Sequence, residues 1–195
     1  MIPQRHDQSA IGLLGGSFNP AHAGHREISL HALERLKLDA IWWLVTPGNP
    51  LKEAKSYAPY EQRLKEARRA ADHARIVVSN FEQRKGLQYT IDTIEALETL
   101  WPQIRFVWLM GADSLASFHK WKDWRRIFSL LPIAVFGRPG YNDDALASEA
   151  ATAFADFRLE GDAAGLAGAE PPAWIFFDST NNAASSTALR ARRSP

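Results

Sequence analysis

Short apolar runs alternate with stretches of helical periodicity along most of this chain, and this alternation restricts its fold more than any other feature. Ile11–Gly16 is apolar and ends in two glycines, which predicts a buried strand that enters a tight loop. From Gly24 apolar residues recur with a helical period, and Ala40–Thr46 is a second apolar run that ends at Pro47. Two strands with a helix between them form a βαβ unit, which is almost always right-handed.

The alternation continues through the rest of the chain and predicts a doubly wound, Rossmann-like α/β fold. Strands that alternate with helices form a mostly parallel sheet with helices on both faces. Ile104–Met110 is the most apolar run and is expected at the centre of the sheet. Further strands are predicted at Ile76–Ser79, Ile133–Phe136 and Trp174–Phe177, and helices at Pro59–His73, Tyr89–Leu100, Asp123–Leu130 and Asn142–Phe157.

The length of 195 residues fits a single domain. Residues 1–10 are polar and lack the apolar core of a secretory signal, so we expect a loose leader. Residues 158–171 contain much Ala and Gly, which predicts a flexible surface connection. No run approaches the roughly 20 apolar residues that a membrane helix needs. We therefore expect a cytoplasmic protein without a membrane partner.

Composition excludes several kinds of chemistry. The formal net charge is +1, which argues against nucleic acid as the main partner. The chain has no cysteine, and this excludes disulfides, thiolate zinc sites, iron–sulfur clusters and cysteine nucleophiles. Whether the chain forms a homo-oligomer is left open by the sequence.

The segment after the first predicted strand reads GGSFNPAHAGH, from Gly15 to His25. In an open parallel sheet, ligands bind beyond the carboxyl ends of the strands, and glycines there let the backbone approach a phosphate. Gly15, Gly16 and Ser17 are therefore candidate phosphate-binding residues. His22 and His25 lie on one face of a helix start. Both can donate hydrogen bonds to a polyphosphate and stabilise charge that grows in a transition state.

Simpler interpretations of this segment stay open. A strand, two glycines and a helix form a common junction. Two histidines three residues apart can be a solvated surface pair, or two ligands of a zinc site, although no third ligand is apparent nearby. The dinucleotide motif GxGxxG is absent, which weighs against a standard dinucleotide-binding site.

Near the other end, the chain reads SSTALR from Ser185 to Arg190. Hydroxyl groups at a helix start, with an arginine one turn further on, can hold the β- and γ-phosphates of a nucleotide. Ser186, Thr187 and Arg190 are the candidates. The alternative is an ordinary helix cap followed by a solvated basic helix.

Two candidates follow the most apolar strand, at the carboxyl edge of the predicted sheet. Gly111 and Asp113 stand where the backbone and a carboxylate can contact a ligand. Trp121 offers a flat surface on which an aromatic ring can stack. Phe118 and Trp124 share its spacing and are interpreted as core residues.

The loop after the second strand reads PGNPLK and ends at Lys52, which can approach a phosphate or be solvated. YTIDT begins at Tyr89 and Thr90, where the simplest interpretation is a helix start. The turn at Arg138 reads RPG; this arginine can lie near phosphates, and no firm role is assigned to it.

Taken together, these segments resemble the nicotinate-nucleotide adenylyltransferases, a family of HxGH nucleotidyltransferases. GGSFNPAHAGH matches every position of the family signature G-G-[ST]-F-[DN]-P-x-H-x-G-H. SSTALR resembles the second signature ISSTxIR, with Ala184 in place of Ile. YTIDT, the G-x-D-x-L-x-x-F-x-x-W segment, the P-x-x-x-P-x-K loop and RPG also resemble family patterns, although Leu51 replaces a common histidine. The resemblance covers the chain from about Ile11 to Arg190.

The resemblance implies a nucleotidyltransferase-type fold that transfers an adenylyl group from ATP to nicotinate mononucleotide. The products would be nicotinate adenine dinucleotide and pyrophosphate, in NAD biosynthesis. Mg²⁺ is expected to arrive with ATP, without a dedicated protein cage. Implied catalytic residues are His22, His25 and Arg190; implied ATP-binding residues are Gly15, Gly16, Ser17, Phe18, Gly111, Asp113, Ser186 and Thr187; implied acceptor-binding residues are Lys52, Tyr89, Thr90 and Trp121. Alternatives are another HxGH enzyme, such as phosphopantetheine adenylyltransferase, or a non-catalytic nucleotide-binding module.

Overall fold

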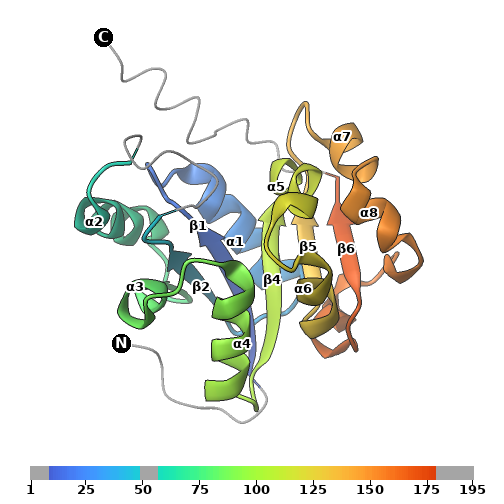
Figure 1. Cartoon of the computed structure of the whole chain (residues 1–195), viewed down its shortest axis with the longest axis horizontal. Coiled ribbons are helices and arrows are strands. Elements are labelled where there is room, and N and C mark those ends of the chain that lie inside the picture. Colours follow the sequence, from blue (N-terminus) through green and yellow to red (C-terminus); the bar gives the residue numbers. More distant parts are fainter. Residues whose placement is uncertain (1–8, 49–56, 179–195) are drawn as a thin grey trace.

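Six parallel strands form one sheet in the order β3-β2-β1-β4-β5-β6 (Figure 1). The computed structural model describes residues 9–48 and 57–178. The chain winds outward from β1 through β2 to β3, then returns to pair β4 with β1 and continues to β6. The strands are β1 (Ala10–Gly16), β2 (Ala40–Val45), β3 (Ile76–Ser79), β4 (Arg105–Gly111), β5 (Ile133–Phe136) and β6 (Trp174–Phe177).

Helices cover both faces of this sheet. On one face, α1 (Ala23–Arg35), α2 (Tyr60–Ala71) and the 3-10 helix η4 (Ala163–Gly168) pack against the strands. The helices that pack on the opposite face are α3 (Phe81–Lys85), α4 (Thr90–Leu100), α5 (Ala112–Ala116), η2 (Phe118–Lys120), α6 (Trp124–Leu130), α7 (Asn142–Leu146) and α8 (Glu149–Ala153). The short 3-10 helix η3 (Ala155–Phe157) follows α8. Figure 1 shows α4 and α6 in front of the sheet.

The strands alternate their side chains between two hydrophobic cores. Leu13 and Trp108 belong to the core under α4 and α6, whereas Leu14 and Leu109 belong to the core under α1 and α2. Such a pattern follows from the period of two along a strand. A Cβ atom at Gly15 would lie 2.6 Å from Cη2 of Trp108, so the indole ring takes the place of a side chain there.

The predicted fold class is confirmed: the sheet is entirely parallel and is covered by helices on both faces. The bounds of β3, β5 and β6 agree with the sequence prediction, and β1, β2 and β4 differ from it by one residue at one or both ends. The helices α2, α4 and α6 also agree to within two residues. Residues 1–8 of the predicted leader lie outside the described part of the chain, and Ala10 already belongs to β1.

The prediction of one helix over Asn142–Phe157 is wrong. The structure has α7, α8 and η3 instead, because Ser148 interrupts the helical run. Its backbone is extended, and its hydroxyl oxygen accepts a hydrogen bond from the backbone N–H of Ala151 at 3.2 Å. Serine favours this capping geometry because its short side chain competes for backbone hydrogen bonds.

Residues 158–171, which the sequence analysis expects to be a flexible surface connection, contain the 3-10 helix η4 and are partly buried. Asp162 caps η4 by accepting from the backbone N–H of Ala164, and the next turns bury Ala163, Leu166 and Ala167 in the core under α1 and α2. The apolar spacing of i, i+3 and i+4 gives the segment a face that the sheet covers. The backbone N–H of Leu159 also bonds to the carbonyl of Trp174 in β6 at 2.7 Å.

None of the helices in residues 9–48 and 57–178 has both the length and the apolar character that crossing a membrane requires.

Leu166→Ala tests whether this segment stabilises the fold. Leu166 is 0% exposed, so we expect the free energy of unfolding to fall by about 2–4 kcal/mol, as for other buried leucines. Leu159→Ala is the matched control, because Leu159 is 37% exposed and its loss should cost under about 1 kcal/mol. Chemical denaturation measures both. Equal, small effects would indicate that η4 contributes no packing energy.

Candidate active site

The candidate site lies at the carboxyl edge of the sheet, where the winding direction reverses between β1 and β4. In a parallel sheet this reversal opens a crevice beyond the strand ends. The loop from Ser17 to His22 follows β1, Asp113 follows β4, and Arg138 follows β5. The carboxyl ends of these strands lie at the upper edge of the sheet in Figure 1. The predicted candidates from distant parts of the sequence meet here.

His22 and His25 cap the start of α1 reciprocally. His22 is the N-cap residue, and its Nδ1 accepts a hydrogen bond from the backbone N–H of Gly24 at 3.1 Å. Nδ1 of His25 accepts from the backbone N–H of His22 at 3.2 Å. The ring centroids are 3.9 Å apart. Serine and glutamate usually form such a capping box, and here two imidazoles do so.

This capping determines which nitrogen of each ring carries a proton. Because Nδ1 accepts a backbone hydrogen bond, the neutral ring is protonated at Nε2. Burial, with a smaller contribution from the nearby charge of Arg138, lowers the pKa of His22 to about 4. Burial lowers the pKa of His25 well below its usual value, and His22 and Arg138 add to the shift. Near pH 7 the site therefore holds two neutral imidazoles, each with an Nε2–H donor.

Aromatic rings of the core pack against the imidazole ring of His25. Phe18 lies 4.7 Å from His25 and stacks on Trp43 at 4.9 Å, measured between ring centroids. Nε1 of Trp43 donates to the hydroxyl of Ser29, which itself donates to the carbonyl of His25. The sequence placed Phe18 among ATP-binding residues, but the ring is buried in the core. Its side chain packs against His25 and Trp43.

Asp113 and Arg138 form an ion pair beside the histidines. Nη1 of Arg138 lies 2.9 Å from Oδ2 of Asp113. The backbone N–H of Arg138 donates to Asn142, whose amide group donates to the carbonyl of Asp178. A Cβ atom on Gly111 would lie 2.5 Å from Oδ1 of Asp113, so a side chain there would displace the carboxylate from this position. The pair places the guanidinium group of Arg138 beside the histidines, with its charge balanced by the carboxylate of Asp113, and the first turn of α1 contains no acidic residue.

Arg63 of α2 holds the site loops together and was not predicted from the sequence. It is 1% exposed, and in the described residues its guanidinium group has no carboxylate partner within ion-pair distance. It donates instead to four backbone carbonyls, those of Ser17 at 2.6 Å, Thr46 at 2.9 Å, Pro47 at 2.9 Å and Ala58 at 3.0 Å. One side chain therefore connects the loop after β1, the end of β2 and the segment before α2. In the sequence, the only indication of this role is that Arg63, a charged residue, lies on the apolar face of the predicted helix beside Leu64 and Ala67.

The predicted acceptor-binding residues form a second group at the same edge. Tyr89 precedes α4 and is partly exposed, and Nζ of Lys122 lies 4.7 Å from its ring centroid. Thr90 is the first residue of α4. Trp121 is half-buried and lies 4.8 Å from Phe118 and 6.4 Å from Trp108 between ring centroids.

The interpretation of Phe118 and Trp124 as core residues is confirmed. Phe118 is fully buried, and Trp124 packs against Phe128 and Phe154. The candidates Lys52, Ser186, Thr187 and Arg190 lie outside the described residues.

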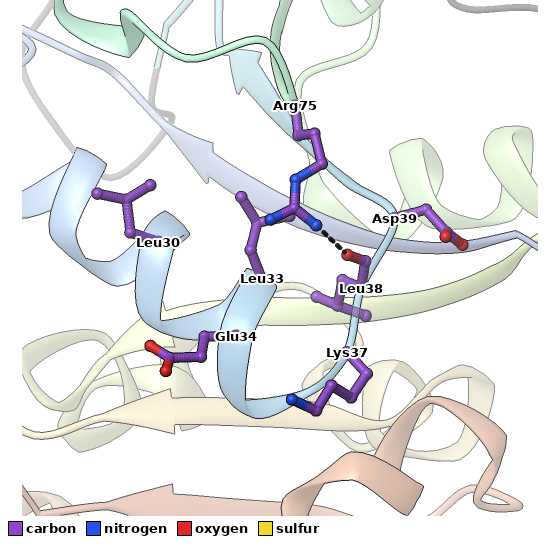
Figure 2. Close-up of a pocket in the computed structure, with 7 residues that line it drawn as sticks. All are labelled: Leu30, Leu33, Glu34, Lys37, Leu38, Asp39 and Arg75. Atoms are coloured by element: carbon purple, nitrogen blue, oxygen red, sulfur yellow. Dashed lines mark hydrogen bonds between the residues drawn. The ribbon is translucent and has the colours of Figure 1, made fainter.

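A pocket at the opposite edge of the sheet does not belong to this site. It lies between the end of α1 and the starts of β2 and β3. Figure 2 shows Arg75 reaching across it to the carbonyl of Leu38, at 3.4 Å. Its position at the amino ends of the strands separates it from the histidines and from Asp113.

No group of three potential metal ligands occurs in residues 9–48 and 57–178. The carboxylate of Asp113 is already paired with Arg138.

Comparison with known proteins agrees with this geometry. Residues 13–192 match the family model described as cytidylyltransferase-like, which places the chain among nucleotidyltransferases. A protein of Methylorubrum extorquens named probable nicotinate-nucleotide adenylyltransferase is 52% identical over 183 residues, which are 93% of this chain and 99% of that protein. The protein of Ruegeria pomeroyi with the same name is 48% identical over 191 residues, 97% of this chain and 89% of its own. The chain therefore belongs to the nicotinate-nucleotide adenylyltransferase family.

Solved structures support the fold. The nicotinic acid mononucleotide adenylyltransferase of Plasmodium falciparum, complexed with NaAD, has a TM-score of 0.70 and 13% identity to this chain. The match covers 94% of this chain and 83% of that one. The same enzyme complexed with APC has a TM-score of 0.69.

Arg63→Met tests the role of the buried guanidinium. The substitution leaves four carbonyls without their donor, so we expect the free energy of unfolding to fall by about 3 kcal/mol or more. Arg69→Met, on the exposed side of the same helix, is the control and should change it by less than about 0.5 kcal/mol. Thermal and urea denaturation measure the difference. An Arg63 variant as stable as the control would show that the four bonds contribute nothing net.

Proposed function

We propose that the site between β1 and β4 transfers the adenylyl group of ATP to nicotinate mononucleotide and forms nicotinate adenine dinucleotide and pyrophosphate. The observation that carries this proposal is the pair of neutral, Nε2-protonated imidazoles at the start of α1. Two preorganised donors at a helix N-terminus match the needs of a polyphosphate. The names of the relatives give the same reaction class.

In the proposed reaction, a phosphate oxygen of the mononucleotide attacks the α-phosphorus of ATP in line. The new P–O bond forms as the bond to the bridging α,β-oxygen breaks, and that oxygen leaves with pyrophosphate. Such transfers depend on positioning and on charge stabilisation, so no protein nucleophile is required. His22 and His25 donate to the phosphate oxygens whose charge grows, and Arg138 adds a fixed positive charge beside them.

The remaining candidates divide between the two substrates in this proposal. Gly15, Gly16 and Ser17 bring backbone close to the triphosphate, and Gly111 with Asp113 contacts the ATP side of the crevice. Tyr89, Thr90 and Trp121 place the pyridine nucleotide. These roles are supported by position at the carboxyl edge. Roles for Lys52, Ser186, Thr187 and Arg190 stay predictions.

Mg²⁺ is proposed to enter as part of the ATP complex, held by phosphate oxygens and water. This agrees with the preference of Mg²⁺ for substrate phosphates over all-protein cages. When bound it would neutralise charge on the phosphates.

Pyrophosphate release tests the proposed function directly. The protein is incubated with ATP and Mg²⁺, with nicotinate mononucleotide, nicotinamide mononucleotide or phosphopantetheine in parallel. We expect release with nicotinate mononucleotide. Release with phosphopantetheine alone would show that the proposed acceptor is wrong, and ATP binding without turnover of any acceptor would indicate a non-catalytic module.

His25→Gln tests the catalytic role of the imidazole. Glutamine at this position can still accept from the backbone N–H of His22, as in a common capping box, so folding should be retained. Loss of a transition-state donor should lower kcat by on the order of a hundredfold or more. A folded variant with wild-type kcat would exclude the role.

Two controls accompany this variant. His31→Gln changes a histidine further along α1 and should leave kcat unchanged. His25→Ala loses the cap and the contacts with Phe18 and Trp43 as well, so its free energy of unfolding should fall by about 1–3 kcal/mol in addition to the loss of activity.

A further inference from the structure

Glu82 is a buried acidic residue that the reaction described above does not use. It is the second residue of α3 and is 6% exposed. Its carboxyl group lies between Thr46, which follows β2, and Thr93 in the first turns of α4. Oε1 is 3.0 Å from the hydroxyl of Thr93, and within the described residues buried Oε2 has no hydrogen-bond partner of normal geometry. A buried acid in such a position requires a reason, because an ionised carboxylate is costly to bury.

Counting hydrogens around this carboxyl group indicates that it is a donor. Each threonine hydroxyl has one hydrogen. The hydroxyl of Thr46 donates its hydrogen to the carbonyl of Gly48 at 3.0 Å. The hydroxyl of Thr93 donates its hydrogen to Oε1 of Glu82 at 3.0 Å and also lies 3.3 Å from the carbonyl of Tyr89. The hydroxyl oxygen of Thr46 can therefore only accept from Glu82, and a protonated carboxyl group supplies that hydrogen.

The surroundings of Glu82 also favour the protonated, neutral carboxyl group. Burial raises the pKa of Glu82 to about 7, although the two threonine hydroxyls oppose the shift. Tyr60 is the titratable group that faces it from α2, and the proximity of Glu82 contributes to the raised pKa of that phenol. In the described part of the chain, no lysine or arginine contributes to the pKa shift of Glu82.

The hydrogen bond of Glu82 reaches the acceptor group of the site through Thr93. Thr93 is fully buried, and both its backbone N–H and its hydroxyl bond to the carbonyl of Tyr89, at 3.1 and 3.3 Å. Tyr89 and Thr90 form the turn into α4. On the other side, the carbonyl of Thr46 is held by Arg63. Glu82 therefore lies between the turn at Tyr89–Thr90 and the carboxyl end of β2.

We propose that Glu82 is a positioning residue for the acceptor nucleotide: as a neutral hydrogen-bond donor, its carboxyl group holds the Tyr89–Thr90 turn against the end of β2. The proposal rests on the acceptor role proposed for Tyr89 and Thr90. It is distinct from a purely structural role because it depends on a proton. As the pH rises through about 7, the carboxyl group ionises, the donor is lost and the turn is held less firmly.

The sign of the pH effect follows from the direction of the pKa shift. The folded protein holds the proton up to a higher pH than an exposed glutamate does, so the neutral form is fully present below the usual pKa and disappears above about 7. The KM for nicotinate mononucleotide should therefore rise with pH in the wild-type protein. The KM for ATP should change little, because the two hydroxyls that contact Glu82 belong to Thr46 and Thr93 and not to the loop from Gly15 to His25.

The experiment compares the wild-type protein with Glu82→Gln and Glu82→Met from pH 6 to pH 9, and measures kcat and both KM values. Glutamine keeps the shape and supplies an N–H donor at every pH, so its KM for the acceptor should stay flat. Methionine removes the donor, and we expect an acceptor KM raised about five- to tenfold at pH 6, the scale of one hydrogen bond. Glu34→Gln, exposed near the opposite edge of the sheet, is the matched control and should follow the wild-type profile.

This experiment distinguishes a failure of the Glu82 proposal from a failure of the proposed adenylyl transfer. If the wild-type protein does not turn over nicotinate mononucleotide, the function itself fails. If it does, a Glu82→Gln profile that rises with pH as the wild type does overturns the positioning role, as does failure of Glu82→Gln to fold. If Glu82→Met does not fold, the comparison of the pH dependence of the acceptor KM between Glu82→Gln and the wild type still tests the proposal. A flat Glu82→Gln profile with unchanged ATP KM supports the proposal.

Discussion

Every neighbouring pair of strands in this sheet is parallel, and this constraint determines where chemistry can occur. Parallel pairing brings all six carboxyl ends to one edge, so loops far apart in the sequence meet there. His22, Asp113 and Arg138 gather where the winding reverses between β1 and β4. Parallel pairing brings these loops together but does not hold them in one conformation. Buried polar side chains hold them.

Arg63 and Glu82 hold these loops in two different ways. Arg63 keeps its charge while buried because four backbone carbonyls replace its water shell. Glu82 has no comparable set of donors among the described residues, so burial raises its pKa and favours the neutral form. The carbonyl of Thr46 accepts from Arg63, and its hydroxyl contacts Glu82. The histidine loop and the Tyr89 turn are therefore both attached to the end of β2.

The sequence predicted the strands, the long helices and the histidine motif, because each depends on a local pattern. Apolar runs and helical periods arise from neighbours in the chain, and a signature such as GGSFNPAHAGH is contiguous. The break at Ser148 and the packing of η4 were missed, since small residues give a weak period. Arg63 and Glu82 were missed because their burial depends on segments distant in the sequence. The burial of the Phe18 ring against His25 also depends on tertiary packing and was not predicted from the motif.

The neutral state of the histidine pair also explains how one small site can bind a ligand with a large negative charge. Two imidazolium ions 3.9 Å apart would repel each other and Arg138, and burial makes that repulsion more costly. The free protein therefore keeps one fixed cation, paired with Asp113, and two neutral donors. A polyphosphate that enters would favour protonation of an imidazole, because a nearby negative charge raises the pKa of histidine. The imidazoles would then become positively charged only when a ligand is present to stabilise the charge. The free protein therefore does not bury two further cations beside Arg138.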